Sequence, residues 1–169
     1  MILETDYLVV GAGAMGMAFA DTILKEQPNT NITLVDKRPA PGGHWLDAYP
    51  YVRLHQPASF YGVNSEKLET HSGDLSSKQE ILAYYSRVLY RMENAGRVKF
   101  FGMTEHTGNG KVRSIVDPNK KIKFRIKKRL VDATYMKVEV PSTTRPNFEV
   151  SKNVNLVPPN HLFSLSASY

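Results

Sequence analysis

The chain has 169 residues, a length that fits one domain or one domain followed by a tail. Apolar residues make up 41% and charged residues 22% of the sequence, which excludes collagen-like, mucin-like and wholly disordered chains. Cysteine is absent, so disulfide bonds, thiolate metal sites, cysteine nucleophiles and redox-active dithiols are excluded.

No apolar run approaches the ~18 residues that a membrane-spanning helix needs. The first residues resemble a secretory signal in their hydrophobicity. Glu4 and Asp6, however, stand where such a signal is basic, and glycines interrupt the apolar stretch. We therefore expect a mature, soluble, cytoplasmic protein without a membrane partner.

The first residues predict a strand, a glycine turn, a helix and a second strand. Residues 6–10 (DYLVV) favour a strand, and a helical pattern follows over 14–26. Residues 31–35 (NITLV) predict the second strand, which Asp36 closes. This order within about 30 residues is a βαβ unit and implies a parallel sheet.

A long irregular segment comes next, over 37–74, and so long a loop is typical of a functional segment. A helix is predicted to start at Ser77, which forms a capping box with Glu80, and to stop at Gly96. Residues 97–101 (RVKFF) predict a third parallel strand.

After this strand the hydrophobic pattern changes to period 2. Ile122, Phe124 and Ile126 alternate with basic residues, which predicts a strand with one charged face. We expect a small antiparallel meander over about 102–128, and one more strand of the parallel sheet over 129–135 (RLVDATY). The predicted fold class is α/β, a Rossmann-like doubly wound parallel sheet with a small antiparallel β-meander.

The net charge of +6 is local. Seven of the 22 basic residues lie in one ten-residue stretch: Lys120, Lys121, Lys123, Arg125, Lys127, Lys128 and Arg129. The other 15 basic residues are balanced by the 16 acidic residues of the chain. No aromatic residues interleave on the charged face, as binding to single-stranded nucleic acid would require. We interpret the strand as a solvated face without a nucleic-acid partner. Steering of NADPH or of an acidic partner is the alternative.

A glycine-rich motif lies between the first strand and the first helix. It reads Gly11-Ala12-Gly13-Ala14-Met15-Gly16, or G-x-G-x-x-G. The glycines permit a tight turn, close approach of a pyrophosphate and close packing of helix on strand, and the helix N-terminus offers N–H groups to phosphates. Asp36 is placed to accept from a ribose hydroxyl. A purely structural turn with an unrelated aspartate is the alternative to this predicted dinucleotide site.

Asp36 suits NAD or FAD, although Lys37 and Arg38 could tolerate a 2′-phosphate. The segment 38–45 (RPAPGGHW) is similar to that of flavoproteins with two dinucleotide-binding domains, of the flavin-containing monooxygenase kind. In those proteins a basic residue and a Gly-Gly-x-Trp segment follow the acid and wrap FAD. The resemblance covers about 5–135, including the meander, and implies FAD as cofactor and NAD(P)H as electron donor of the full-length enzyme. It also implies that Gly43, His44 and Trp45 line the cofactor.

The following segment, 51–57 (YVRLHQP), is rich in donors and acceptors. We expect it, with Arg53 and His55, to approach the flavin ring. The alternatives are that Trp45 is a core anchor and that Arg53 is a surface charge.

Some features differ from that family. Tyr135 stands where the last strand usually has glycine, and a Phe-x-Gly…His segment is absent, with 141–146 (PSTTRP) in its place. Residues 136–169 are too short and proline-rich for a second nucleotide-binding domain. We expect an FAD-binding domain over 1–135, and a connector or truncated start of a following domain over 136–169.

No metal site is predicted, because the histidines lack metal-ligand spacing. The residues indicate no catalytic acid or base. The predicted function is the FAD-binding part of an NAD(P)H-dependent oxidoreductase of the monooxygenase-like kind, with an unidentified small-molecule substrate. The alternatives are a non-catalytic dinucleotide-binding module and an NAD(P)-only Rossmann protein. An unfinished sheet edge would make self-association plausible.

Overall fold

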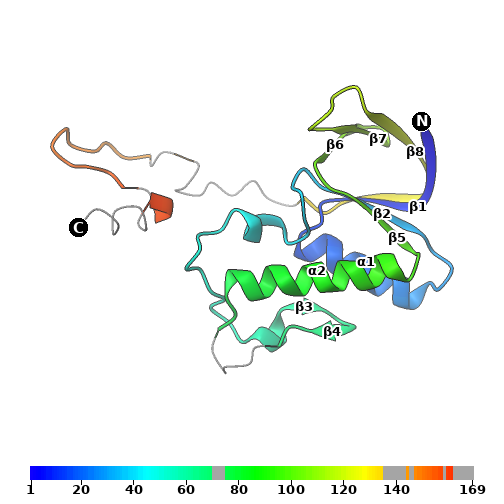
Figure 1. Ribbon diagram of the computed structural model, residues 1–169, viewed down its shortest axis with the longest axis horizontal. Coiled ribbons are helices and arrows are strands. Elements are labelled where there is room, and N and C mark those ends of the chain that lie inside the picture. Colours follow the sequence, from blue (N-terminus) through cyan, green and yellow to red (C-terminus); the bar gives the residue numbers. More distant parts are fainter. Residues whose placement is uncertain (70–74, 135–143, 145–146, 158, 162–169) are drawn as a thin grey trace. The chain divides into compact units, whose positions relative to one another are not determined.

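Figure 1 shows the computed structural model, which describes all residues except 70–74, 135–143, 145–146, 158 and 162–169. The chain divides into two compact units, Met1–Thr134 and Tyr135–Tyr169. In the second unit the described residues include a short 3₁₀ turn, Pro159–His161. In the described part of the chain, no helix has the length and hydrophobicity that crossing a bilayer requires.

A six-stranded sheet forms the centre of the first unit, in the order β5-β2-β1-β8-β7-β6. The first four strands in that order run parallel, whereas β8, β7 and β6 are joined antiparallel. The predicted α/β class with a meander is thus confirmed. The strands are β1 (Ile2–Val10), β2 (Ile32–Val35), β5 (Val98–Phe101), β6 (Thr104–Gly108), β7 (Lys111–Ser114) and β8 (Lys121–Asp132).

Helices and meander cover opposite faces of the parallel strands. Helices α1 (Ala14–Glu26) and α2 (Lys78–Asn94) lie on one face, and β6 and β7 lie on the other (Figure 1). Because side chains alternate along a strand, neighbouring residues of β1 enter different cores. Val9 packs with the helices, whereas Leu8 packs with residues of the meander such as Phe124.

Helix α2 begins and ends where its sequence predicts. The Ser77 hydroxyl accepts a hydrogen bond from the Glu80 N–H at 3.3 Å, and Glu80 accepts one from the Ser77 N–H at 2.7 Å, which completes the capping box. Gly96 has φ +72°, the left-handed conformation that suits a glycine after a helix.

Strand β8 differs from prediction, because the meander strand and the strand expected over 129–135 are one continuous element. Its first residues pair with β7, and from Lys123 to Asp132 it runs along β1. The exposed run Lys127-Lys128-Arg129 breaks the period-2 pattern, which is why the sequence suggested two strands. The structure accommodates this run by a register shift opposite Thr5 and Tyr7.

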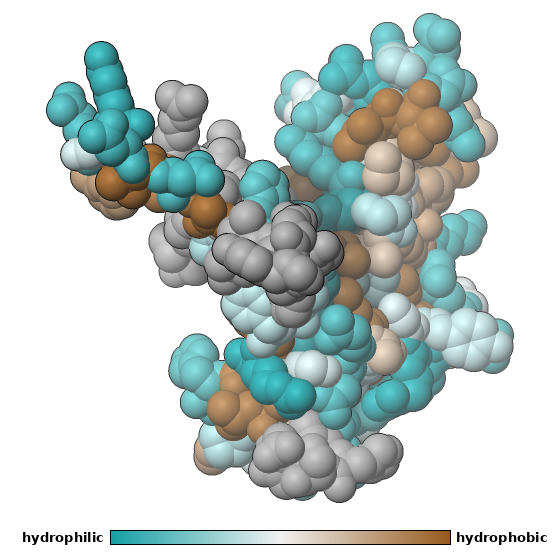
Figure 2. Space-filling view, turned by 60° about the vertical axis from the view of Figure 1, so that its left-hand side comes forward, coloured by the Kyte–Doolittle hydropathy of each residue, from teal (hydrophilic) through white to brown (hydrophobic). Residues whose placement is uncertain are grey.

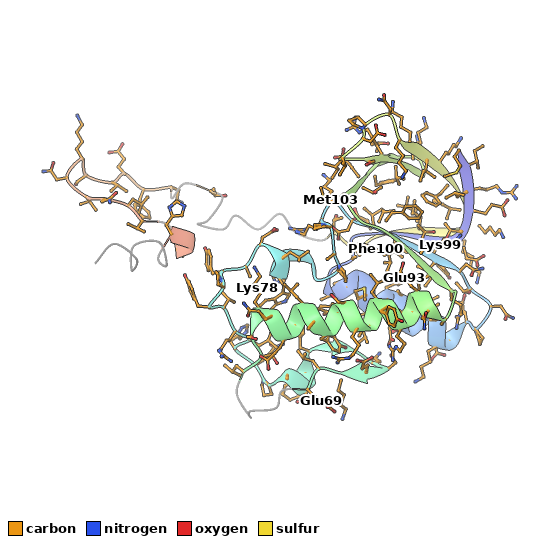
Figure 3. The ribbon with its side chains drawn as sticks, in the orientation of Figure 1. Glu69, Lys78, Glu93, Lys99, Phe100 and Met103 are labelled. Carbon is orange, nitrogen blue, oxygen red and sulfur yellow. The ribbon has the colours of Figure 1, made fainter. Side chains whose placement is uncertain are left out.

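The outer edge of β5 is partly covered. Its Phe100 N–H donates to the Glu93 carboxylate at 3.0 Å, near the end of α2 (Figure 3). The adjacent Lys99 is exposed. A carboxylate on an outward N–H and an exposed lysine both discourage pairing with another strand.

A small hairpin, β3 (Gly62–Val63) and β4 (Glu66–Lys67), is fastened to α2 by the hydroxyl of Tyr84. This fully buried hydroxyl accepts from the Val63 N–H at 2.7 Å and donates to the Glu66 carbonyl oxygen at 2.6 Å. Burial raises the pKa of Tyr84, so the side chain remains a donor throughout the ordinary pH range.

We expect Tyr84→Phe to lower the free energy of unfolding by about 1–3 kcal/mol, because it leaves the buried Val63 N–H without its acceptor. Urea denaturation followed by circular dichroism measures this change. Tyr90→Phe is the matched control, since Tyr90 is 69% exposed on the same helix. Equal stability of the two variants would contradict the assigned role of Tyr84.

Candidate functional site

The carboxyl ends of β1, β2 and β8 meet at one edge of the parallel sheet. The chain proceeds from β1 to β2 and β5 on one side, whereas β8 lies on the other side of β1. This change of direction is a topological switch point, where doubly wound sheets bind their ligands. The glycine motif and Asp36 both lie at this edge.

The glycine turn permits close approach of backbone to backbone. Gly11 has φ +102°, and a Cβ there would lie 3.0 Å from the Ala133 carbonyl oxygen. A Cβ on Gly16 would lie only 1.9 Å from the Gly11 carbonyl oxygen. Helix α1 can therefore pack against the end of β1 only with glycine at this position.

The N-terminus of α1 is open to a ligand. Its N-cap residue, Gly13, supplies no side-chain cap, and no acidic residue lies in the first turn. The N–H groups of Ala14, Met15 and Gly16 are the first of the helix, and none of the described side chains caps them. The Met15 side chain is 65% exposed. Such an end favours an anion, phosphate above all.

The structure brings the predicted cofactor loop against this turn. The Gly42 N–H donates to the Ala12 carbonyl oxygen at 2.9 Å. A Cβ on Gly43 would lie 2.9 Å from the Gly13 Cα, so the two backbones touch. Gly43 begins a 3₁₀ turn, Gly43–Leu46. Residues far apart in sequence thus form a continuous strip of backbone without side chains.

Asp36 joins the end of β2 to the glycine turn. Its carboxylate accepts from the Ala12 N–H at 2.6 Å and from the Arg38 N–H at 2.9 Å. The residue is 7% exposed. A carboxylate has about four acceptor positions, so two remain for other donors.

The two basic residues after Asp36 are engaged with acids. Lys37 forms an ion pair with Glu105 at 3.1 Å, and the Nε–H of Arg38 donates to Asp47 at 2.9 Å. Both cations are therefore at least partly neutralised by neighbouring carboxylates, which lowers their attraction for a phosphate.

Trp45 and His44 occupy different environments. Trp45 is 6% exposed, belongs to the helix-side core, and its indole N–H donates to the Tyr61 hydroxyl at 2.6 Å. His44 is exposed, beside Trp45. Partial desolvation and then the Arg38 guanidinium lower the pKa of His44, so the imidazole is neutral at pH 7. The packing of Trp45 thus agrees with the interpretation of this residue as a core anchor.

Arg53 and His55 are both exposed. The Arg53 guanidinium donates to the Leu75 carbonyl oxygen at 2.9 Å, and its backbone bridges to Ser77 at the start of α2. No described contact joins either residue to the glycine turn. Tyr135 and the segment 141–143 lie outside the described residues.

Lys78 is a residue that the sequence analysis missed. It lies in the first turn of α2 (Figure 3), where its ammonium donates to the Leu46 carbonyl at 3.0 Å and the Ala48 carbonyl at 2.8 Å. It thereby holds the end of the His44–Trp45 turn on the helix. Its only sequence signal is a lysine at the positive end of a helix, which is an unfavourable place.

The second and third glycines of the motif offer different tests. We expect Gly16→Ala to lower the free energy of unfolding by more than about 3 kcal/mol, because its methyl group would overlap the Gly11 carbonyl. Gly13→Ala should cost about 1 kcal/mol or less, because its Cβ would lie 3.4 Å from Gly43 Cα, an ordinary contact. Thermal unfolding compares the two variants. Equal losses would contradict the described packing.

Comparison with known proteins agrees with this geometry. Residues 9–60 match the model of an NAD(P)-binding Rossmann-like domain. An uncharacterized protein of Mycobacterium tuberculosis is 42% identical over 171 residues, covering 95% of this chain and 31% of its own length. The probable FAD-binding monooxygenase AlmA of Acinetobacter baylyi is 29% identical, covering 56% and 19% respectively. The chain thus spans about a third or less of these relatives.

Solved structures share the fold. A flavin-containing monooxygenase from Stenotrophomonas maltophilia superposes with a TM-score of 0.56 at 20% identity, over 78% of this chain and 38% of that one. A cyclohexanone monooxygenase superposes with a TM-score of 0.55 at 22% identity, over 79% and 27%. The chain thus belongs to the same family as the mycobacterial protein, and Met1–Thr134 has a Rossmann-like fold similar to that of the flavin monooxygenases.

Proposed function

We propose that the chain binds FAD, with the pyrophosphate on the Gly11–Gly16 turn and the adenosine ribose on Asp36. The observation that carries this proposal is the strip of bare backbone formed by Gly13 and Gly43 beside an uncapped helix N-terminus. A pyrophosphate needs N–H donors, a positive helix end and the absence of side chains, and this strip offers all of these.

The environment of Asp36 fits the ribose. Its carboxylate is fixed by the Ala12 and Arg38 N–H groups and keeps acceptor positions for hydroxyl groups. The turn that would hold the phosphates also fixes the Asp36 carboxylate. The ribose site and the phosphate site therefore keep a fixed position relative to each other. This coupling supports binding of a whole dinucleotide.

Three observations favour FAD over NADP(H). AlmA, whose name describes it as a probable FAD-binding monooxygenase, aligns over 96 residues. The neutralisation of Lys37 by Glu105 and of Arg38 by Asp47 leaves little attraction for a 2′-phosphate beside the Asp36 carboxylate. The resemblance of residues 38–45 to FAD-wrapping segments supports the same choice.

We further propose that this domain serves an NAD(P)H-dependent flavoprotein oxidoreductase of the monooxygenase-like kind. The length of the mycobacterial relative, of which the chain covers 31%, leaves room for other domains in such proteins. When bound, the flavin supplies the redox chemistry. The chain's own residues bind and orient: the glycine turn holds phosphates, Asp36 holds ribose, and Lys78 fixes the loop that carries His44. No catalytic acid or base is assigned.

The first test is retention of flavin. We expect the purified chain, incubated with excess FAD and desalted, to keep the flavin absorption bands, and Gly13→Ala to weaken FAD binding at least about tenfold by obstructing the pyrophosphate. Lys25→Ala is the control, at an exposed position in the last turn of α1, away from the glycine turn. Binding of NADH without FAD would instead support an NAD(P)-only protein.

Reduction of the bound flavin is a separate readout. Bleaching by NADPH under anaerobic conditions, faster than that of free FAD, would support hydride transfer by this chain itself. Retained but unreduced FAD would support a non-catalytic binding module.

A second prediction concerns the ribose. Adenosine 2′,5′-bisphosphate should compete with FAD at least about tenfold less well than adenosine 5′-monophosphate, because its 2′-phosphate would meet the Asp36 carboxylate without a free cation. Competition titrations measured by flavin fluorescence give the ratio. Equal competition would contradict the assignment of Asp36 to the ribose hydroxyls.

A further inference from the structure

Basic residues cover the outer face of the meander, at the end of the sheet remote from the candidate site. In the register of the strands, Lys123 stands between Ile2 of β1 and Lys111 of β7, and Lys121 stands opposite Arg113. Residues paired in register present their side chains on the same face of a sheet. The basic face comprises Lys111, Arg113, Lys121, Lys123, Arg125 and Lys127, all exposed.

This arrangement places like charges directly opposite one another, twice in succession. Lys111 faces Lys123, and Arg113 faces Lys121. Like charges at such positions are destabilising. A strand that merely needed a solvated face could carry threonine, glutamate or glutamine there, so the repulsion itself requires an explanation.

Acidic residues neutralise this face only at its margins. Glu4 of β1 forms ion pairs with Arg125 and Lys127, and Glu105 of β6 pairs with Arg113 at 2.9 Å. Among the described residues, Lys111, Lys121 and Lys123 form no ion pair. The centre of the face is therefore a cluster of three uncompensated ammonium groups.

Apolar side chains accompany the charges. Ile2, beside Lys123, is 70% exposed, and the β7–β8 turn carries Ile115 at 44% and Val116 at 75% exposure. Figure 2 shows hydrophobic side chains gathered on the part of the molecule that holds the meander, among hydrophilic ones. Aliphatic groups beside lysines suit an interface with a charged surface and an apolar interior.

We propose that the basic face docks the domain on an anionic lipid surface, with its lysines near the headgroups and Val116 at the acyl boundary. Charge complementarity selects anionic headgroups. A protein partner is disfavoured, because protein interfaces are depleted in lysine and enriched in aromatic residues, and the six basic residues here have no aromatic neighbour on their face.

A nucleic acid fits the face less well. Single strands bind through aromatic stacking, and the register pairs place no aromatic residue among these cations. Base readout in duplex DNA requires an element that enters a groove, whereas these side chains stand on the broad face of two paired strands, β7 and β8. The proposal departs from the expectation of a solvated face and of no membrane partner, because the sequence of one strand does not show which cations stand opposite one another in the sheet.

The test is co-sedimentation of the full chain with phosphatidylcholine vesicles that contain about 30 mol% phosphatidylserine. We expect binding that falls when salt rises from about 0.1 M to 0.5 M, and none to pure phosphatidylcholine. The double substitution Lys111→Glu and Lys121→Glu should weaken binding at least about 25-fold, since each basic residue contributes about fivefold. Val116→Ser should weaken it by a smaller factor.

The same substitutions provide a control for folding. Lys111→Glu and Lys121→Glu replace two repulsive cross-strand pairs by attractive ones, so the melting temperature should be equal or higher while binding is lost. The matched variant Lys67→Glu and Lys99→Glu changes the net charge equally at exposed positions on other strands, and should change binding less than about twofold.

Three results would overturn the proposal. One is undiminished vesicle binding by the Lys111→Glu and Lys121→Glu variant. Another is equal binding to vesicles with and without phosphatidylserine. The third is tighter binding to a DNA duplex than to the anionic vesicles at the same salt concentration, which would assign the face to a nucleic acid.

Discussion

The missing side chain of Gly16 is the constraint on which the rest of the domain depends. Because the Gly11 carbonyl oxygen would lie 1.9 Å from a Cβ there, α1 sits as close to the end of β1 as a polypeptide allows. That closeness sets the direction in which the first N–H groups of the helix point. It also places Ala12 where Asp36 and Gly42 reach its backbone groups. One short turn thus fixes a helix, a strand end and a loop.

The sequence predicts those parts of the domain that depend on local chemistry. The capping box at Ser77, the left-handed Gly96 and the helix over 14–26 are determined by neighbouring residues, and the structure contains each of them. The glycine motif and Asp36 lie at one sheet edge as expected, because parallel strands align their carboxyl ends.

Contacts between residues far apart in the chain cannot be predicted from local sequence patterns. Nothing local reveals that Gly13 touches Gly43, or that Lys78 donates to the carbonyls of Leu46 and Ala48. The continuity of β8 was missed for a related reason: three exposed basic residues in a row suggest a strand end unless the neighbouring strand is known. Trp45 shows the same limit, since its partner Tyr61 is distant in sequence.

The two ends of strand β8 lie in two chemically different surroundings. Its first half carries alternating basic and apolar residues over the meander core, whereas Ala133, the residue after its end, contacts the glycine turn. The candidate site therefore relies on backbone and on one fixed carboxylate, whereas the proposed docking surface at the opposite end relies on exposed ammonium groups. One strand thus connects a site of fixed geometry with a surface that would recognise its partner through point charges on flexible stems.

The central position of β1 has a consequence for biosynthesis. Its partner on one side, β2, emerges from the ribosome soon afterwards, but β8 begins about 110 residues later. At ordinary translation rates the second edge of β1 stays open for roughly 5–20 s, with Leu8 lacking the meander residues that later bury it. The first strand made is thus closed by the last strand of its sheet. Chaperone protection would matter most in that interval, and a ribosome stalled before residue 132 would release an incomplete sheet.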